Sequence, residues 1–191
     1  IEESQTRELY AGYERNYGAL MSQQYPPYVR HVEYYEAPDV EVLYEDPGEH
    51  INHFLYLNGL WLNTQESLVH ARETMDYEDY IALKFFGTSV NVVMAPESQE
   101  GEAEVSEEAV PYEVRIILDD GPVPEERAGR DIMYDSDGNS YVTVDRSRMY
   151  SLVNMDDFGG GVLKLSSNSP DFTVFAFTFG SYEGGEPVAT S

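Results

Sequence analysis

The chain has 191 residues, of which 36 are acidic and 11 basic, and its formal net charge is −25. The few Lys and Arg residues do not cluster in the sequence, which excludes nucleic-acid binding, because a phosphate backbone is bound by clustered Lys and Arg. The charge is explained most simply by solubility, and a bound cation or a basic partner is the sharper alternative. The absence of cysteine excludes disulfides, Cys-ligated metals and dithiol chemistry in this chain.

The bulk composition favours one folded domain without a membrane span. A hydrophobic fraction of 41% with 13% aromatic residues is enough for a packed core in a chain of this length. No apolar run approaches the ~20 residues of a transmembrane helix. The chain starts at Ile1 without a Met or a signal-like segment, from which we expect a processed or trimmed N-terminus.

The first 48 residues predict an irregular arm, rich in Tyr and Pro, that packs on the rest of the domain. Large residues between Leu9 and Leu20 have the spacing of one helix face, but Gly12 and Gly18 weaken a helix there. An aromatic arm draped over a sheet is an equally good interpretation. Four prolines between residues 24 and 48 then favour extended surface chain with short edge strands.

Residues 49–184 predict an all-β domain. Apolar runs of strand length are separated by Gly, Asn, Asp and Pro, with no strong long helix after residue 80. We expect two strands in residues 80–94 with a turn at 87–89, a hairpin turn at 120–121, and a turn at the glycines of 159–161. This pattern predicts an antiparallel β-sandwich, jelly-roll-like, followed by a tail at 185–191. Residues 96–111, with six Glu, predict a solvated acidic loop.

The final strand, FTVFAFTFG at 172–180, is the most apolar segment. By strict alternation, Phe175, Phe177 and Phe179 share one face, and Val174 lies on the other. We expect the Phe face to pack inward and neighbouring strands to cover both backbone edges, because a bare edge of this kind aggregates.

One segment has the spacing of calcium ligands. Asp135, Asp137 and Asn139 stand at alternating positions in DSDGNSYVTVDR, as in a calcium-binding loop. The sixth position is Ser140 instead of Gly, and the twelfth is Arg146 instead of a bidentate Glu. Calcium is therefore a candidate cofactor at these three residues, and a polar hairpin turn is the alternative.

No residue pattern predicts catalysis. The four histidines at positions 31, 50, 53 and 70 are scattered, and the chain has no GxSxG nucleophile motif. Sequence spacing says nothing about a glycosidase pair among 36 carboxylates. A hydrolase built on the sandwich is the weakest of three hypotheses for the function.

Aromatic residues are the candidate binding groups. Tyr25, Tyr28, Tyr34 and Tyr35 fall in the proline-rich arm, where exposed rings offer a large contact area to a sugar or a protein partner. The single tryptophan, Trp61, lies within an apolar strand and is predicted to be core.

The order of these segments resembles a known family. ELYAGYERNYG, HFLYLNGLWL, YIALKFFGTSVNVVM, RIILDDGPV, SRMYSLV, GVLKLSS and VFAFTFG are similar, in this order, to the C-terminal domain of DipZ-type thioredoxin-like proteins. The resemblance implies a carbohydrate-binding-module-like jelly roll that follows a thioredoxin-fold domain. The redox cysteines belong to that preceding domain, so no catalytic residue is carried over.

The resemblance implies a non-catalytic, extracytoplasmic role, periplasmic or secreted. We expect an accessory or docking module that binds a protein partner within a larger membrane-associated assembly, of a redox or electron-transfer kind. The alternative is a carbohydrate-binding module that uses the exposed tyrosines. The acidic insertion and the Tyr/Pro-rich segment exceed the family minimum, and either is a candidate docking surface.

Overall fold

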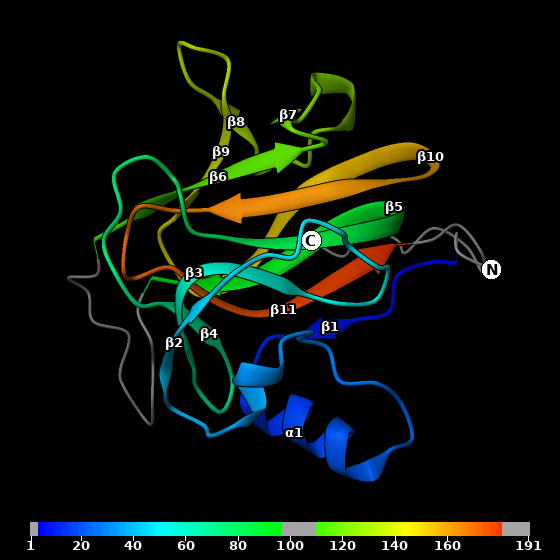
Figure 1. Ribbon diagram of the computed structural model, residues 1–191. Helices are drawn as coiled ribbons and strands as arrows, with labels where there is room; N and C mark the ends of the chain where they lie inside the picture. Colours follow the sequence, from blue (N-terminus) through cyan, green and yellow to red (C-terminus); the bar gives the residue numbers. More distant parts are fainter. Residues whose placement is uncertain (1–3, 97–109, 181–191) are drawn as a thin grey trace.

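The computed structural model describes residues 4–96 and 110–180 (Figure 1). The predicted acidic loop at 96–111 falls almost entirely outside the described residues, and the tail at 185–191 does so completely. Within the described ranges, no helix has the length and apolar character needed to span a membrane. The elements in chain order are β1 (Leu9–Tyr10), α1 (Tyr13–Ser22), η1 (Val32–Tyr35), β2 (Glu41–Tyr44), β3 (Tyr56–Asn63), β4 (Leu68–His70), β5 (Tyr80–Ala95), β6 (Tyr112–Leu118), β7 (Gly121–Pro122), η2 (Glu125–Arg127), β8 (Met133–Tyr134), β9 (Ser140–Val144), β10 (Arg148–Ser166) and β11 (Thr173–Gly180).

The strands form an eleven-stranded antiparallel sheet that folds over itself into a sandwich, which confirms the predicted all-β class. Its order is β1-β11-β4-β3-β5-β10-β6-β9-β8, with β2 beside β3 and β7 beside β6. β11 pairs with β5 as well as with β4, so the sheet curls back on itself at this side (Figure 1). The curled sheet encloses one continuous apolar core, in which Trp61 is 0% exposed, as predicted.

Two long strands replace turns that the sequence led us to expect. Residues 80–95 form one strand, and residues 148–166 form another that pairs with it along most of its length. The expected turn at 87–89 and the expected turn at 159–161 are therefore both wrong. Gly159 pairs with Gly87, and a Cβ on Gly160 would lie 2.6 Å from the Phe85 carbonyl oxygen. These glycines allow two backbones to approach closely, so the glycine-rich signal here marks tight pairing.

The predicted hairpin after β6 forms, but its turn lies one residue earlier than the expected 120–121. Leu118 pairs with Gly121, and the two residues between them, Asp119 and Asp120, have φ values of 49° and 65°. Positive φ at both central positions is what a two-residue hairpin turn with the right-handed strand twist requires.

The phenylalanine strand β11 is covered on both edges, by β5 on one side and by β1 and β4 on the other. Its predicted alternation holds at Phe177 and Phe179, which pack into or against the core, and fails at Val174 and Phe175. The register with β5 shifts between Val174 and Ala176, and this bulge changes which side chains face the core. Val174 and Phe177 are fully buried, whereas Phe175 lies outside the core and lines a surface cavity.

The N-terminal arm contains a helix of ten residues, so the arm is less irregular than predicted. α1 lies beneath β1, at the margin of the sandwich (Figure 1). Tyr13, Asn16 and Ala19 form its buried face. The helical spacing in the sequence correctly indicated a helix but not its buried face, because Tyr17 and Leu20 are exposed. Gly18 lies on the open side of the helix, where an added Cβ would have no atom within 4 Å.

Candidate functional site

A cavity of about 600 Å³ opens between α1 and β11. Three aromatic side chains, those of Tyr10, Tyr25 and Phe175, contribute to its wall. Glu14 and Glu66 add carboxylates to the same wall. The arrangement combines apolar ring faces with hydrogen-bond acceptors, which suits an amphipathic ligand more than a purely apolar one.

The first turn of α1 is held in place by backbone contacts that require a glycine. The Tyr13 N–H donates to the Thr64 carbonyl at 2.8 Å, and the Glu14 N–H donates to the Gln65 carbonyl at 3.0 Å. These bonds satisfy N–H groups that a helix start leaves free. A Cβ on Gly12 would lie 2.5 Å from the Gln65 carbonyl oxygen, so this close approach excludes a larger residue.

Asn16 joins α1 to the rest of the arm. Its side chain is fully buried, and its Nδ2 donates to the carbonyls of Tyr10 and Gly12 at 2.8 Å. Its Oδ1 accepts the N–H groups of Tyr28 and Val29, also at 2.8 Å. One side-chain amide therefore joins the chain before α1 to the chain after it. The sequence analysis did not single out Asn16. The feature that could have indicated its role is a polar side chain on a helix face that is otherwise apolar.

The four predicted tyrosines have different surroundings. Tyr25 is 48% exposed at the cavity. Tyr28 and Tyr34 are buried, so the expectation that they offer exposed rings is wrong. The Tyr34 hydroxyl donates to the Ala11 carbonyl at 2.7 Å, and the Tyr35 hydroxyl donates to the Val29 carbonyl. Burial raises the pKa of Tyr34 and of Tyr35, which remain neutral donors. The segment that carries them packs against the core, so the expectation of extended surface chain is wrong there.

The outer face of α1 carries apolar residues as well. Tyr17, Leu20 and Met21 are 41%, 40% and 63% exposed. Leu20 and Met21 stand three and four positions after Tyr17, which places the three side chains on one side of the helix. The helix wall of the cavity is made by other residues, among them Gly18 and Ala19. We call these three residues the α1 stripe. The helix therefore carries apolar residues on two faces, and the rest of the domain covers only one of them.

The predicted calcium ligands lie together in a turn before β9. One Asp135 carboxylate oxygen accepts the N–H groups of Asp137 and Asn139 at 2.9 Å, and the other accepts the Asn139 amide at 3.2 Å. The backbone hydrogen bond from Asn139 is the main reason why the pKa of Asp135 is lowered. Among the described residues, no group of three or more His, Asp or Glu side chains is placed to hold a metal ion. Calcium binding at this turn stays a prediction.

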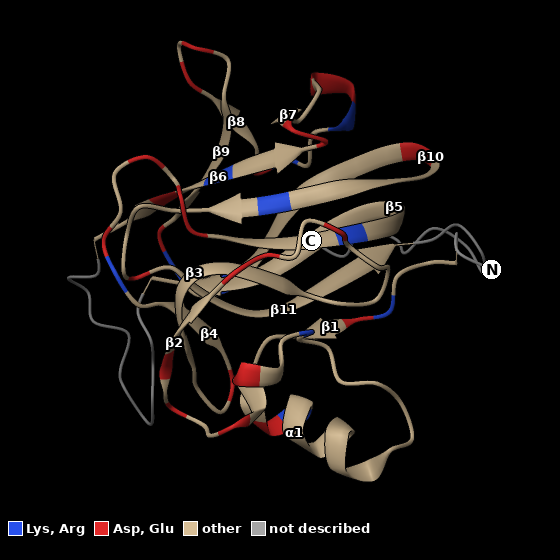
Figure 2. Cartoon of the chain, in the orientation of Figure 1, with Lys and Arg blue, Asp and Glu red and all other residues tan. Residues whose placement is uncertain are grey.

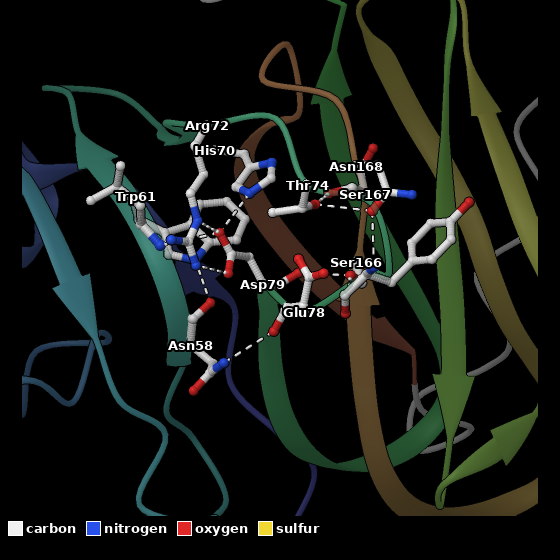
Figure 3. A network of polar contacts seen from close by, with 12 residues as sticks. Asn58, Trp61, His70, Arg72, Thr74, Glu78, Asp79, Ser166, Ser167 and Asn168 are labelled. Atoms are coloured by element: carbon white, nitrogen blue, oxygen red, sulfur yellow. Dashed lines mark hydrogen bonds and ion pairs between the residues drawn. The ribbon is translucent and has the colours of Figure 1, made fainter.

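A buried polar network joins β4, the start of β5 and the chain after β10 (Figure 3). His70 Nε2 lies 2.8 Å from Asp79 Oδ2, and His70 Nδ1 lies 2.8 Å from the Ser169 carbonyl oxygen. Both partners carry acceptor oxygens, so the ring is held between a carboxylate and a backbone carbonyl. Arg72 adds a two-pronged contact to Asp79 at 2.7 and 2.6 Å.

The hydrogen bonds around Asp79 indicate that the network stabilises the fold. Burial alone would raise the pKa of Asp79, but hydrogen bonds from Arg72 and His70 outweigh it and lower that pKa. The Leu60 N–H also donates to Asp79 at 3.2 Å. No hydroxyl nucleophile contacts His70 among its hydrogen-bond partners in the described chain. We interpret the group as a structural ion network, which sequence spacing did not reveal.

The other histidines lie apart from this network. His31 Nε2 accepts the Leu57 N–H at 2.8 Å, and burial lowers the pKa of His31. His50 Nε2 lies 2.9 Å from Asp46, which also accepts the Tyr80 hydroxyl at 2.6 Å. His53 accepts the Arg7 N–H through its Nδ1 at 3.1 Å. The expectation of scattered histidines therefore fits the part of the chain that the structure describes.

Comparison with known proteins agrees with this architecture. The thioredoxin-like C-terminal domain family matches residues 6–180, which is most of the chain. No curated protein matches the chain in sequence. The matched range runs from the residue that precedes β1 by three positions to the last residue of β11, so it includes α1, the cavity and the polar network. The chain therefore belongs to the thioredoxin-like C-terminal domain family.

Proposed function

We propose that this domain is a non-catalytic accessory module that docks a protein partner outside the cytoplasm. Its place would be a larger membrane-associated assembly in which neighbouring domains or subunits supply redox or electron-transfer chemistry. The family match supports an accessory role of this kind. The chain has no cysteine, so thiol chemistry in such an assembly has to come from another domain or subunit.

The α1 stripe is the observation that carries the docking proposal. Tyr17, Leu20 and Met21 leave an apolar side of the helix exposed. Contiguous exposed apolar surface on a soluble domain marks interaction sites. Aromatic and Met side chains are also enriched where protein partners meet.

Site-specific photo-crosslinking in native cells tests this proposal. A photoreactive amino acid at position 21 should give a discrete adduct with a protein partner, and so should one at position 17. Met149 on β10 is the matched control, because it is also an exposed methionine, at 48% against 63% for Met21. Adducts that form equally well at position 149, or none at either α1 position, would overturn the docking proposal. Fractionation of the same cells tests the location outside the cytoplasm.

Carbohydrate binding is the second candidate function, and the composition of the cavity favours it. Sugar rings stack on aromatic faces, and their hydroxyl groups bond to carboxylates and guanidinium groups. Tyr25 offers an exposed ring, and Arg15 lies with its guanidinium carbon 4.2 Å from the Tyr10 ring centre. Retardation in polysaccharide-containing gels is the assay. A Tyr25→Ala variant should lose the retardation and Tyr17→Ala should keep it, whereas mobility unchanged by every polysaccharide removes this candidate.

A further inference from the structure

Among the described strands, β2 lies at an edge and has one unpaired side. Within the described part of the chain, its four residues pair with β3 alone, from Glu41 opposite Leu62 to Tyr44 opposite Gly59. In an antiparallel pair, backbone groups alternate between pointing at the neighbour and pointing away. Half of the N–H and C=O groups of β2 therefore face outward, where an added strand can bond to them.

The outward side chains of β2 alternate acid and apolar. Val42 and Tyr44 turn toward the core side, where Val42 lies opposite the buried Trp61. Glu41 and Leu43 turn to the other face, and Leu43 is 66% exposed. Glu45 follows at the next alternating position and is exposed too. The outer row therefore reads carboxylate, leucine, carboxylate.

The outer face of β3 extends the apolar part of this row. Leu60 pairs with Leu43, and Leu62 pairs with Glu41. Both β3 leucines are half-buried, so they form a ledge next to the more exposed Leu43. An apolar side chain on an added strand would contact Leu43 from the free side.

Charge determines which occupant fits this edge. Between Arg30 and Arg72 the sequence has eight Asp and Glu and no Lys or Arg. Figure 2 shows acidic residues and no basic ones along the chain from η1 through β2. A second copy of the chain would bring carboxylates against carboxylates. The chain's own segment at 97–109 has six Glu and no basic residue, so it does not supply the complementary charge either.

We propose that β2 docks an extended basic segment of a partner protein by strand addition. The segment carries Lys or Arg at positions i and i+4 and an apolar residue at i+2, all on one face. The two basic groups lie beside Glu41 and Glu45, the apolar group lies beside Leu43, and the backbone continues the sheet. This surface is separate from the α1 stripe and does not depend on its role.

A synthetic peptide tests the proposal on the 191-residue chain. The probe is acetyl-Thr-Lys-Thr-Leu-Thr-Lys-Thr-amide with a fluorescent label, and binding is followed by anisotropy and by amide NMR shifts. We expect binding that shifts the amides of residues 41–44. A peptide with Glu in place of Lys should not bind. A peptide with N-methyl groups at alternate amides, made in both phases, should fail to bind in one phase because strand addition needs those donors.

Charge-reversal variants locate the site. Glu41→Lys with Glu45→Lys should weaken binding of the probe about tenfold, because two favourable cross-strand charge pairs become unfavourable. Glu113→Lys with Glu126→Lys makes the same change in net charge at two exposed residues elsewhere and should have little effect. Equal loss in both double variants would mean that the probe senses only overall charge. Full binding of both N-methylated peptides, or no binding of the probe at all, would mean that no strand adds to β2 and that its carboxylates serve to prevent pairing with other strands. Any of these results would overturn strand addition.

Discussion

Asp79→Asn is the sharpest perturbation of the fold, because it removes one charge from a buried network and leaves the side-chain shape unchanged. Asp79 is 1% exposed, and it accepts hydrogen bonds from His70, from both prongs of Arg72 and from the Leu60 N–H. The amide cannot accept at both of its terminal atoms. The Arg72 guanidinium then lacks its counter-charge, and one of the donors around Asp79 loses its acceptor.

The expected loss in unfolding free energy is about 3 to 5 kcal/mol, the range for removing one partner of a buried ion pair. That loss is a large part of the ~5 to 15 kcal/mol that stabilises an ordinary domain. Arg72→Ala is the control, since 42% of the Arg72 side chain is exposed and solvent screens its pairing. It should lower the unfolding free energy by about 1 kcal/mol.

Urea unfolding followed by tryptophan fluorescence is the assay. Trp61 is the single tryptophan, it is fully buried, and its ring centre lies 5.2 Å from that of His70. The emission therefore reports the environment of the network itself. A loss for Asp79→Asn no greater than that for Arg72→Ala would refute the reasoning, because it would mean that the network is already solvated.

The pH dependence of the unfolding free energy is a second test of the role of Asp79. The pKa of Asp79 is lowered in the folded state from its ordinary value of 3.8, against the effect of burial, by bonds from Arg72 and His70. A lowered folded pKa contributes stability that is present above about pH 4 and lost as the pH falls through the folded pKa. Asp46 and Asp131 have lowered pKa values as well and act in the same direction. The unfolding free energy should therefore decline below pH 4, and Asp79→Asn should make that decline shallower.

Three further predictions concern the arm and the turn before β9. Asn16→Ala should lower the unfolding free energy by about 3 kcal/mol and speed amide exchange at residues 28–29, because two buried N–H groups lose their acceptor. Exchange at these amides that stays slow would contradict this. Gly12→Ala should be strongly destabilising in thermal melts, since its Cβ meets backbone at 2.5 Å, whereas Gly18→Ala, with open space around it, should stabilise α1 by ~0.5 to 1 kcal/mol. Equal effects of the two would show that the close approach at Gly12 relaxes. Asp135→Ala should lower the midpoint of thermal unfolding by the same small amount in chelator and in calcium, because its carboxylate already accepts the turn's hydrogen bonds; a loss seen only with calcium would instead support a metal at that turn.

Some features of the candidate surfaces were predictable and others were not. Tyr25 was predicted as an exposed ring and is one, whereas Tyr28 and Tyr34 were assigned to the same surface and are buried. Nothing local distinguishes these residues, because their burial depends on contacts with other segments, such as the hydrogen bond from the Tyr28 N–H to Asn16 Oδ1. The bulge in β11 is equally invisible in the sequence. It changes the side on which Phe175 lies, and that change helps to form the cavity.

The sequence by itself determined the β class, the core position of Trp61, the existence of the hairpin after β6 and the likeness to the family. These features depend on alternation, composition and turn chemistry, which act between near neighbours along the chain. Tertiary structure alone decided that residues 80–95 and 148–166 run on as single strands, and that His70, Arg72 and Asp79 meet around one buried charge. Both outcomes depend on pairing between segments far apart in the chain, and the energy of such contacts has no local signature in the sequence.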